Sequence, residues 1–198
     1  MNTTFGTFSG EPKTAWLTED QADRRMKLVE AFWYKGKVMD VAVPKDYRID
    51  GASIPRALWS LVGSPYTGDY RRASIVHDWA CDDAKGDITK RRAADRMFYY
   101  ACRAGGCSWP QAVMLYIGVR IGAWLDRVPR WQEGEIQRDA PRLLRSAADL
   151  AIERDFSAAA TVVLRQCETK RIIDDADEIE RSTDEILETL TGLDFRQA

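Results

Sequence analysis

The stretch Tyr70-Arg-Arg-Ala-Ser-Ile-Val-His77-Asp-Trp-Ala-Cys-Asp-Asp83 is followed by Ala-Lys-Gly86-Asp87 and then by a second helical pattern. Gly86 interrupts the first pattern, and Asp87 or Thr89 is a good N-cap for the second. The sequence therefore predicts two helices, from about 70 to 83 and from 87 or 89 to just before Gly105. If they form an antiparallel hairpin, His77 and Asp95 lie at similar heights, because each helical residue advances about 1.5 Å.

A third helix is predicted to follow Gly105-Gly106. Ser108 and Gln111 have the spacing of a capping box, and Pro110 suits a first helical turn. Apolar side chains repeat at helical spacing beyond it, at Val113, Met114, Ile117, Ile121, Trp124 and Leu125. The three helices form the predicted core.

The region before the helices favours β structure. Met26–Tyr34 is rich in strand-forming residues, Lys35-Gly36-Lys37 is a turn signal, and Val38–Pro44 resumes the strand pattern. A β-hairpin or small antiparallel sheet is expected there. Residues 50–70 are rich in Gly, Pro and Ser and predict a long ordered loop, with a helical turn at Arg56–Val62. The expected fold class is α+β and mostly helical.

The C-terminal region differs in composition and predicts a helical extension. We expect a core over residues 1–129 and an extension over 130–198. Ile172, Ile179, Ile186 and Leu193 recur every seven residues, with Ala176 and Leu190 four positions after a seam residue, and Thr183 interrupts the seam. Two interpretations stay open: a helix packed on its own domain, or a homo-oligomer assembled through 172–193.

The overall composition is that of a globular protein. Its 29 basic and 31 acidic residues give a formal net charge of −2, so no nucleic-acid partner is expected. The four cysteines form no CxxC pair and no zinc-finger spacing, which predicts four reduced thiols. The N-terminus lacks signal-peptide features, and the apolar run 112–125 is too short to span a bilayer. A soluble protein made in a cytoplasm is expected.

The chain's one histidine defines the candidate chemistry. Asp95 can accept a hydrogen bond from one nitrogen of His77, which leaves the other nitrogen to take a proton from water. Asp78 follows His77 on the helix and points about 100° away from it. Asp50, Asp78 and loop carbonyls would make an all-oxygen site that suits calcium. The alternative interpretation is structural, with His77 merely packed and Asp95 paired with Arg91 or another arginine.

Two other nucleophiles are weighed against activated water. Ser53 could act with His77 as base and Asp95 as the orienting residue, but it lacks the Gly-x-Ser-x-Gly elbow, so its alternative role is bonding to the loop backbone. Cys81 lies four residues after His77 on the same helix face. A buried, inert thiol is the favoured interpretation of Cys81.

These motifs resemble a known enzyme group over Asp50–Cys102. The order Asp50-Gly-Ala-Ser…Pro55, His77-Asp78 on a helix and Ala94-Asp95…Phe98 resembles prokaryotic secreted phospholipase A specific for the sn-2 position. The resemblance implies calcium at Asp50 and Asp78, water activation by His77, and orientation of His77 by Asp95. The disulfides of that group are mostly absent, and Cys81 stands where the group has a tyrosine.

A second resemblance covers roughly residues 14–125. Val43-Pro44, Asp50-Gly-Ala-Ser-Ile-Pro-Arg56, His77-Asp78-Trp79, Ala94-Asp95 and Val119-Arg120-Ile-Gly122 resemble a family of unknown function that is frequent in phages and prophages. Two hypotheses follow. One is a calcium-dependent hydrolase of a lipid or amphiphilic ester. The other is a non-catalytic virion, assembly or host-interaction protein, made in the host cytoplasm, that contacts phage structural proteins.

Overall fold

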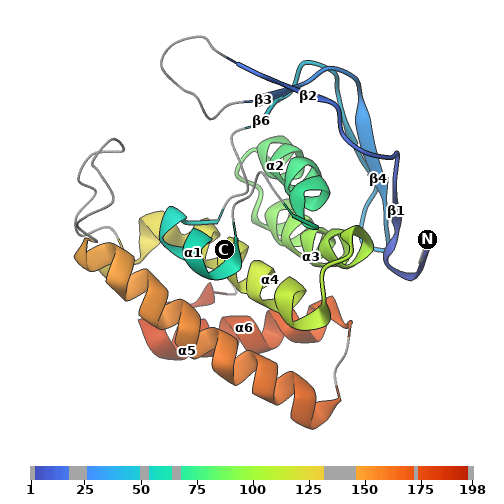
Figure 1. The fold of residues 1–198 in the computed structure, drawn as a ribbon. Helices are drawn as coiled ribbons and strands as arrows, with labels where there is room; N and C mark the ends of the chain where they lie inside the picture. The colour runs from blue at the N-terminus through green and yellow to red at the C-terminus, as the bar shows by residue number, and fades with distance from the viewer. Residues whose placement is uncertain are drawn as a thin grey trace. The chain divides into compact units, whose positions relative to one another are not determined.

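A computed structural model describes residues 3–17, 26–49, 54–63, 68–131, 146–171 and 174–195. The described chain contains six α-helices and two three-stranded antiparallel sheets, and the sheets lie in its N-terminal region (Figure 1). This arrangement confirms the predicted α+β, mostly helical fold class. The chain divides into two compact units, Met1–Ala52 with Ser64–Ala112, and Ser53–Gly63 with Val113–Ala198. The predicted division at Pro129 stays a prediction.

The first unit holds both sheets. One sheet has the order β1-β4-β5, and its strands are Thr7–Phe8, Phe32–Lys35 and Val41–Val43. The other has the order β2-β3-β6, and its strands are Thr14–Trp16, Met26–Leu28 and Arg48–Ile49. Buried and exposed residues alternate along β4 and β5, so each of these strands turns one face toward the interior.

The predicted hairpin is present but shorter than expected. β4 and β5 pair antiparallel, with Tyr34 opposite Val41, across the turn that contains Gly36. The run Met26–Tyr34, which is rich in strand-forming residues, is not one continuous strand. It forms two strands in different sheets, because β3 pairs with β2 and β6 while Val29–Ala31 leave the extended pattern. Strand-forming side chains continue through this bend, so composition alone does not reveal it.

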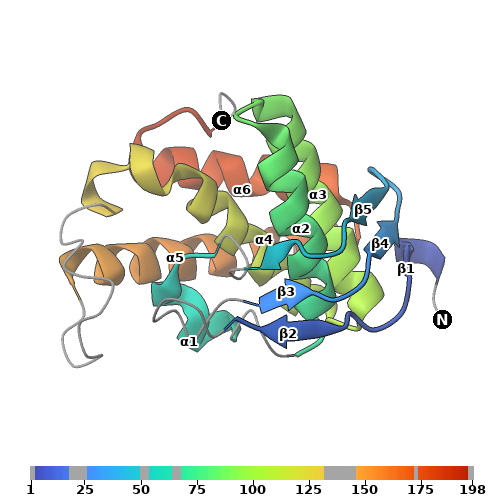
Figure 2. The ribbon, with the colours of Figure 1, turned by 90° about the horizontal axis from the view of Figure 1, so that it is seen from above.

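Two antiparallel helices form the body of the first unit. α2 covers Arg71–Ala84 and α3 covers Ile88–Gly105, and they lie side by side (Figure 2). Asp87 caps α3 by accepting a hydrogen bond from the Lys90 amide at 3.1 Å, and Gly106 ends it in the left-handed conformation. The predicted helix hairpin is confirmed. α2 also packs against β4 and β5, and α3 against β1, so the β1-β4-β5 sheet lies against the helix pair.

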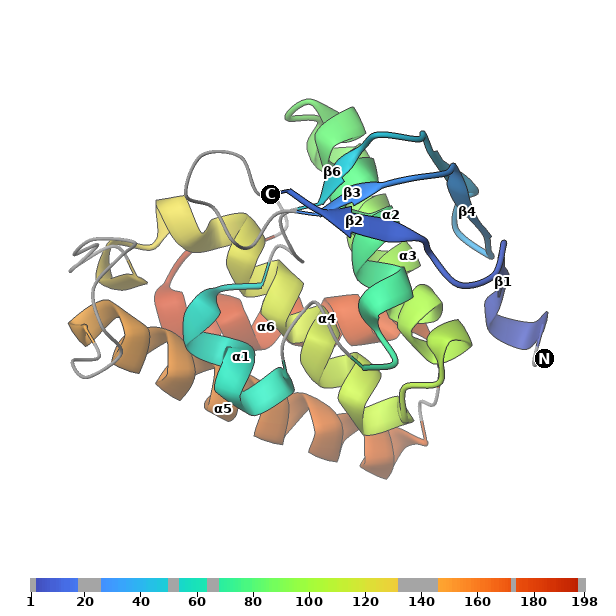
Figure 3. The ribbon, with the colours of Figure 1, turned by 45° about the horizontal axis from the view of Figure 1, so that its top comes forward.

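The second unit is helical. It contains the short 3₁₀-helix η2 (Arg56–Leu58) and α1 (Trp59–Val62), which confirm the predicted helical turn, and the main helices α5 (Ala147–Lys170) and α6 (Ala176–Thr191). α5 packs against α6 and η2 (Figure 3). It also packs against η4 (Pro129–Trp131), which follows η3 (Leu125–Arg127). Ser146 and Asp149 form a reciprocal capping box at the start of α5.

α4 covers Trp109–Trp124 and confirms the third predicted helix of the core. It is buried on more sides than the predicted stripe, since Leu115, Tyr116 and Val119 are fully buried in addition to Val113 and Ile117. A helix that is apolar all round is expected in a protein interior. Of the helices in the described residues, none combines the length and the apolar character that a membrane crossing requires.

The heptad residues of α6 lie partly inside their own unit. Ile179 and Leu187 are fully buried, and so is Thr183, which interrupts the predicted seam. Ile186, Leu190 and Leu193 are half-buried, while Ile172 lies outside the described residues. Burial of Ile179 supports the interpretation of a helix packed on its own domain. Self-association through 172–193 stays a prediction.

Candidate active site around His77

His77 and Asp95 contact each other between α2 and α3. The distance from His77 Nε2 to Asp95 Oδ1 is 2.8 Å, and both side chains are fully buried. The His77 ring also packs on Phe98, with 4.7 Å between the ring centroids. The pairing predicted from helix heights is therefore present, with Nε2 as the nitrogen that faces the carboxylate.

Burial decides the charge state of this histidine. Desolvation lowers the pKa of His77 below its ordinary value, although the hydrogen bond and the negative charge of Asp95 act in the opposite direction. The positive charge of Arg91 lowers the pKa of His77 further. A neutral imidazole follows at neutral pH. When Nε2–H donates to Asp95, Nδ1 carries the lone pair and is the basic atom.

Arg91 is a second partner of the same carboxylate. Its Nε donates to Asp95 Oδ1 at 3.2 Å, across one turn of α3. The alternative prediction, in which Asp95 pairs with Arg91, is thus realised together with the histidine pairing. Arg91 Nη2 is buried and has no hydrogen-bond partner within the described part of the chain. Through Oδ1, Asp95 accepts hydrogen bonds from both the imidazole of His77 and the guanidinium of Arg91.

Cys81 contacts the imidazole from the same helix. Its Sγ lies 3.4 Å from His77 Nε2 and 3.8 Å from Nδ1. The residue is only partly buried, yet desolvation raises the pKa of its thiol well above the ordinary value. A protonated thiol is a weak nucleophile, so this environment agrees with the prediction of an inert cysteine rather than a catalytic one.

The donor atoms of His77, Cys81 and Asp95 all lie within 4.8 Å of one another. Over the ranges that the structure describes, this is the one group of three or more histidine, cysteine or acidic side chains that is close enough to share a metal ion. It is a different set from the predicted calcium ligands.

The predicted calcium ligands are only partly described. Asp78 lies on α2 beside His77 and is 5% exposed. Asp50 and the alternative nucleophile Ser53 lie outside the described residues. The convergence of Asp50 with Asp78 therefore stays a prediction, as does the serine scheme.

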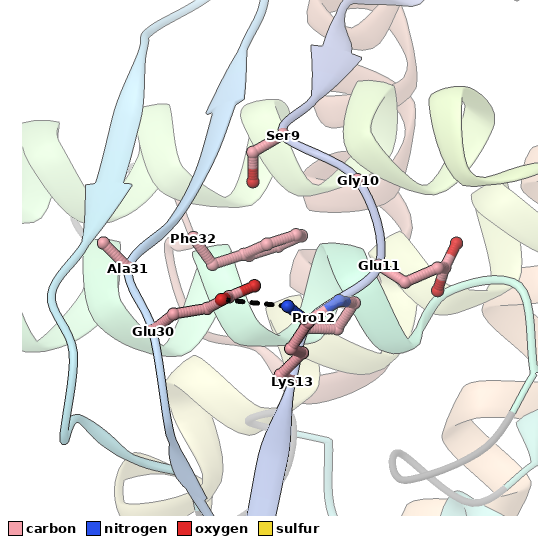
Figure 4. A pocket seen from close by; sticks show the side chains of 8 residues that line it. All are labelled: Ser9, Gly10, Glu11, Pro12, Lys13, Glu30, Ala31 and Phe32. Atoms are coloured by element: carbon pink, nitrogen blue, oxygen red, sulfur yellow. Dashed lines mark hydrogen bonds and ion pairs between the residues drawn. The ribbon is translucent and has the colours of Figure 1, made fainter.

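A pocket in the first unit is lined by residues other than those of the histidine–aspartate cluster. It is bordered by the segments Ser9–Lys13 and Glu30–Phe32, and includes neither His77 nor Asp95 (Figure 4). Lys13 and Glu30 face each other across it at 3.1 Å and are largely exposed. An exposed ion pair of this kind contributes little to stability. We do not assign a catalytic role to this pocket.

Two further contacts of the cluster, those of Cys81 and Arg91, follow from sequence spacing. Cys81 follows His77 by four residues and Arg91 precedes Asp95 by four, so each pair shares a helix face. Those spacings signal both contacts. Combined with the His77–Asp95 pairing, which the sequence prediction leaves separate from them, they place the thiol and the guanidinium around the same histidine–aspartate pair.

In comparisons with known proteins, residues 26–119 match the model of the family described as Protein of unknown function (DUF1353). Uncharacterized protein y4jT of Sinorhizobium fredii (strain NBRC 101917 / NGR234) is 35% identical over 118 residues, which are 58% of this chain and 33% of that protein. Uncharacterized protein y4iH of the same organism is 37% identical over 87 residues, 44% of this chain and 33% of that protein.

The chain thus spans about a third of the length of these curated relatives. No solved structure matches it. The matched segment 26–119 contains the whole His77–Asp95 cluster and most of the residues that carry the predicted resemblance to a family of unknown function. The similarity of this segment of the chain is therefore to a family without an assigned activity.

Proposed function

We propose that the His77–Asp95 pair is the general-base centre of a hydrolase that cleaves a lipid or related amphiphilic ester. The observation that carries the proposal is the 2.8 Å contact between His77 Nε2 and Asp95 Oδ1 inside the α2–α3 hairpin. A carboxylate on one imidazole nitrogen fixes the tautomer and leaves the other nitrogen basic. The neutral state favoured by burial suits that role.

In the proposed reaction, His77 Nδ1 takes a proton from water while the water oxygen attacks the ester carbonyl. Asp95 keeps the ring oriented and stabilises the imidazolium that forms. Nδ1 then returns the proton to the departing alkoxide, so that an acid and an alcohol result. Arg91 Nε donates to the same Asp95 oxygen, Oδ1, at 3.2 Å and so helps to hold the carboxylate in place. The ring therefore needs no reorganisation during the reaction.

Calcium is part of this proposal through Asp50 and Asp78. A buried carboxylate such as Asp78 offers the hard oxygen donor that calcium prefers, so this member of the donor set fits the ion. When bound, calcium would supply a positive charge for the oxyanion that develops on the substrate. The same proposal places the protein in a phage particle. There it would act outside the host cytoplasm, in surroundings rich in calcium.

A second candidate function is favoured by one observation. The side chains of His77 and Asp95 are both 0% exposed, as expected of a buried polar pair that only stabilises the helix hairpin. Under this candidate the protein is a non-catalytic phage virion, assembly or host-interaction factor. The two candidates differ in whether the imidazole ever receives a proton from bound water.

The test measures ester hydrolysis by the full chain on phospholipid vesicles and on a soluble chromogenic ester, with calcium or with a chelator. We expect calcium-dependent release of the acid product. His77→Gln keeps a donor toward Asp95 and removes the basic nitrogen, so the rate should fall by roughly 10²–10⁴-fold. Asp95→Asn should reduce the rate while the substrate KM changes little, because the carboxylate acts on the reacting imidazole.

Asp83→Asn is the matched control, because Asp83 is an exposed carboxylate on the same helix. It should leave the rate unchanged. Asp78→Asn and Asp50→Asn should weaken calcium binding in isothermal titration. If the wild-type rate does not exceed that of a folded His77→Gln variant, the hydrolase proposal fails and the scaffold candidate remains.

A further inference from the structure

We propose that His77, Cys81 and Asp95 form a binding site for a thiophilic divalent cation, with Zn²⁺ as the best match. The three donors come from neighbouring helices and offer one nitrogen, one sulfur and one oxygen within 4.8 Å of one another. This site differs from the predicted calcium site, which uses oxygen alone. The inference goes beyond the proposed hydrolysis and stands without it.

The distances are close to those of tetrahedral coordination. With bonds of about 2.3 Å to sulfur and about 2.0–2.1 Å to nitrogen, the N–S edge of a zinc tetrahedron is about 3.5 Å and the N–O edge about 3.3 Å. The His77 Nε2–Cys81 Sγ distance is 3.4 Å and already matches. The Nε2–Oδ1 distance to Asp95 is 2.8 Å. A widening of about half an ångström would therefore admit the ion between these two donors.

The donor types select the metal. Thiolate and imidazole favour zinc and similar ions, whereas calcium and magnesium take oxygen ligands. Of the three residues, His77 and Asp95 are buried and Cys81 is partly buried. Three protein ligands would leave a fourth position for water.

Charge and protons also balance. Thiolate and carboxylate together neutralise the ion, and Arg91 donates to Asp95 as an outer partner that orients the ligating carboxylate. Binding releases the thiol proton of Cys81 to solvent. The proton on His77 Nε2 must leave that atom and return to the ring at Nδ1, because Nε2 becomes the ligand.

Zinc binding would also affect the proposed ester hydrolysis. Only this effect rests on the proposed function. When a cation occupies Nε2, the hydrogen bond to Asp95 is lost and the ring's one proton lies on Nδ1, so the imidazole can no longer accept a proton from water. Zinc should therefore inhibit ester hydrolysis, and chelation should restore it.

The experiment uses the full chain without a polyhistidine tag, stripped by a chelator and kept in a non-thiol reductant. Zn²⁺ is titrated in competition with a chromogenic chelator, and Co²⁺ is added separately as a spectroscopic probe. Because the chain has one histidine, ¹⁵N-histidine labelling gives NMR signals from His77 alone. We expect one ion per chain, a thiolate-to-cobalt charge-transfer band, and a large shift of the Nε2 signal on zinc binding.

Variants separate this site from other thiols and from adventitious binding. Cys81→Ala should abolish the charge-transfer band and lower zinc affinity at least tenfold, while Cys167→Ala, at a buried thiol on α5, should leave both unchanged. Thermal melts of both variants check the fold. Absence of stoichiometric binding, or zinc binding that survives in Cys81→Ala with unmoved His77 signals, would overturn the proposal. Metal binding is measured without substrate, so an inactive but zinc-binding protein refutes the hydrolase alone.

Discussion

The central residue of this protein is a fully buried histidine whose surroundings favour its neutral form. Burial lowers the pKa of His77, and the adjacent Asp95 offsets only part of that effect. The unfolded chain, in contrast, has an imidazole with an ordinary pKa of about 6.5. Protonation below that pH therefore favours the unfolded state, which links the stability of the fold to pH.

We predict that the free energy of unfolding is fully retained above about pH 6.5 and declines as the pH falls below it, toward the lowered pKa of the folded state. The contribution of His77 to the slope is at most about 1.4 kcal/mol per pH unit. Urea unfolding of the chelator-treated protein at several pH values measures it. His77→Gln is the comparison, because it removes the titrating group. An identical pH slope in both proteins would contradict the prediction.

A glycine beside the α2–α3 hairpin gives a steric prediction. A Cβ added to Gly105, at the end of α3, would meet the backbone carbonyl oxygen of Asp69 well inside van der Waals contact. A backbone atom cannot move aside as a flexible side chain can. Gly105→Ala should therefore lower the free energy of unfolding by roughly 1–3 kcal/mol, despite the better helix propensity of alanine.

Gly118→Ala is the control, because its nearest neighbours would be carbons of the Ile54 side chain, at 3.3 Å and beyond. Ile54 can adjust, so this change should cost less than Gly105→Ala. Thermal denaturation of the two variants compares them. Equal stability of Gly105→Ala and the wild type would show that the chain near Asp69 yields.

At the residue scale, the pairing of His77 with Asp95 could be predicted because it depends on regular helix geometry across a short turn. The contacts of Cys81 and Arg91 follow the same four-residue spacing. Spacing along one helix does not show which side chains of the neighbouring helix lie against it. The partner of Asp78 in the predicted calcium site, Asp50, lies outside the described residues, and the sequence only predicts a loop there, where no regular period relates sequence to position.

At the scale of elements, the helices could be predicted far better than the strands. Helix ends are marked by local signals such as Asp87, Gly106 and Ser146, each of which acts on amides or carbonyls within a few residues. The strands have only two to four residues each, and their limits depend on partners distant in sequence. β3 is an example, since Met26 pairs with Ile49.

The N-cap of α3 gives a prediction at this scale. Asp87 accepts the Lys90 amide at 3.1 Å, and this bond satisfies one of the free amides at the helix start. Asp87→Ala should lower the free energy of unfolding by about 1 kcal/mol. Asp83→Ala removes an exposed carboxylate on the other side of the turn and should cost less. Chemical denaturation distinguishes them, and equal losses would assign the effect to charge rather than capping.

For the chain as a whole, the main unexpected feature is a buried arginine in the apolar helix α4. This residue is Arg120. In the structure its Nη2 donates to Asp184 Oδ1 of α6 at 3.0 Å and to the Phe195 carbonyl at 3.2 Å. Arg120 is fully buried and Asp184 nearly so. Within the second unit, the charged pair therefore ties α6 to α4, 64 residues earlier in the chain.

A buried pair of this kind costs desolvation when it forms, but breaking it leaves an uncompensated charge in the interior. Asp184→Ala should therefore lower the free energy of unfolding by roughly 3–5 kcal/mol, whereas Glu185→Ala, at the exposed neighbouring position, should have little effect. The double variant Arg120→Met/Asp184→Leu removes both charges and should recover most of the loss. Urea unfolding followed by far-ultraviolet circular dichroism measures all three. If the double variant is no more stable than Asp184→Ala, the cost lies in lost packing or in the Phe195 contact, and the charge argument fails.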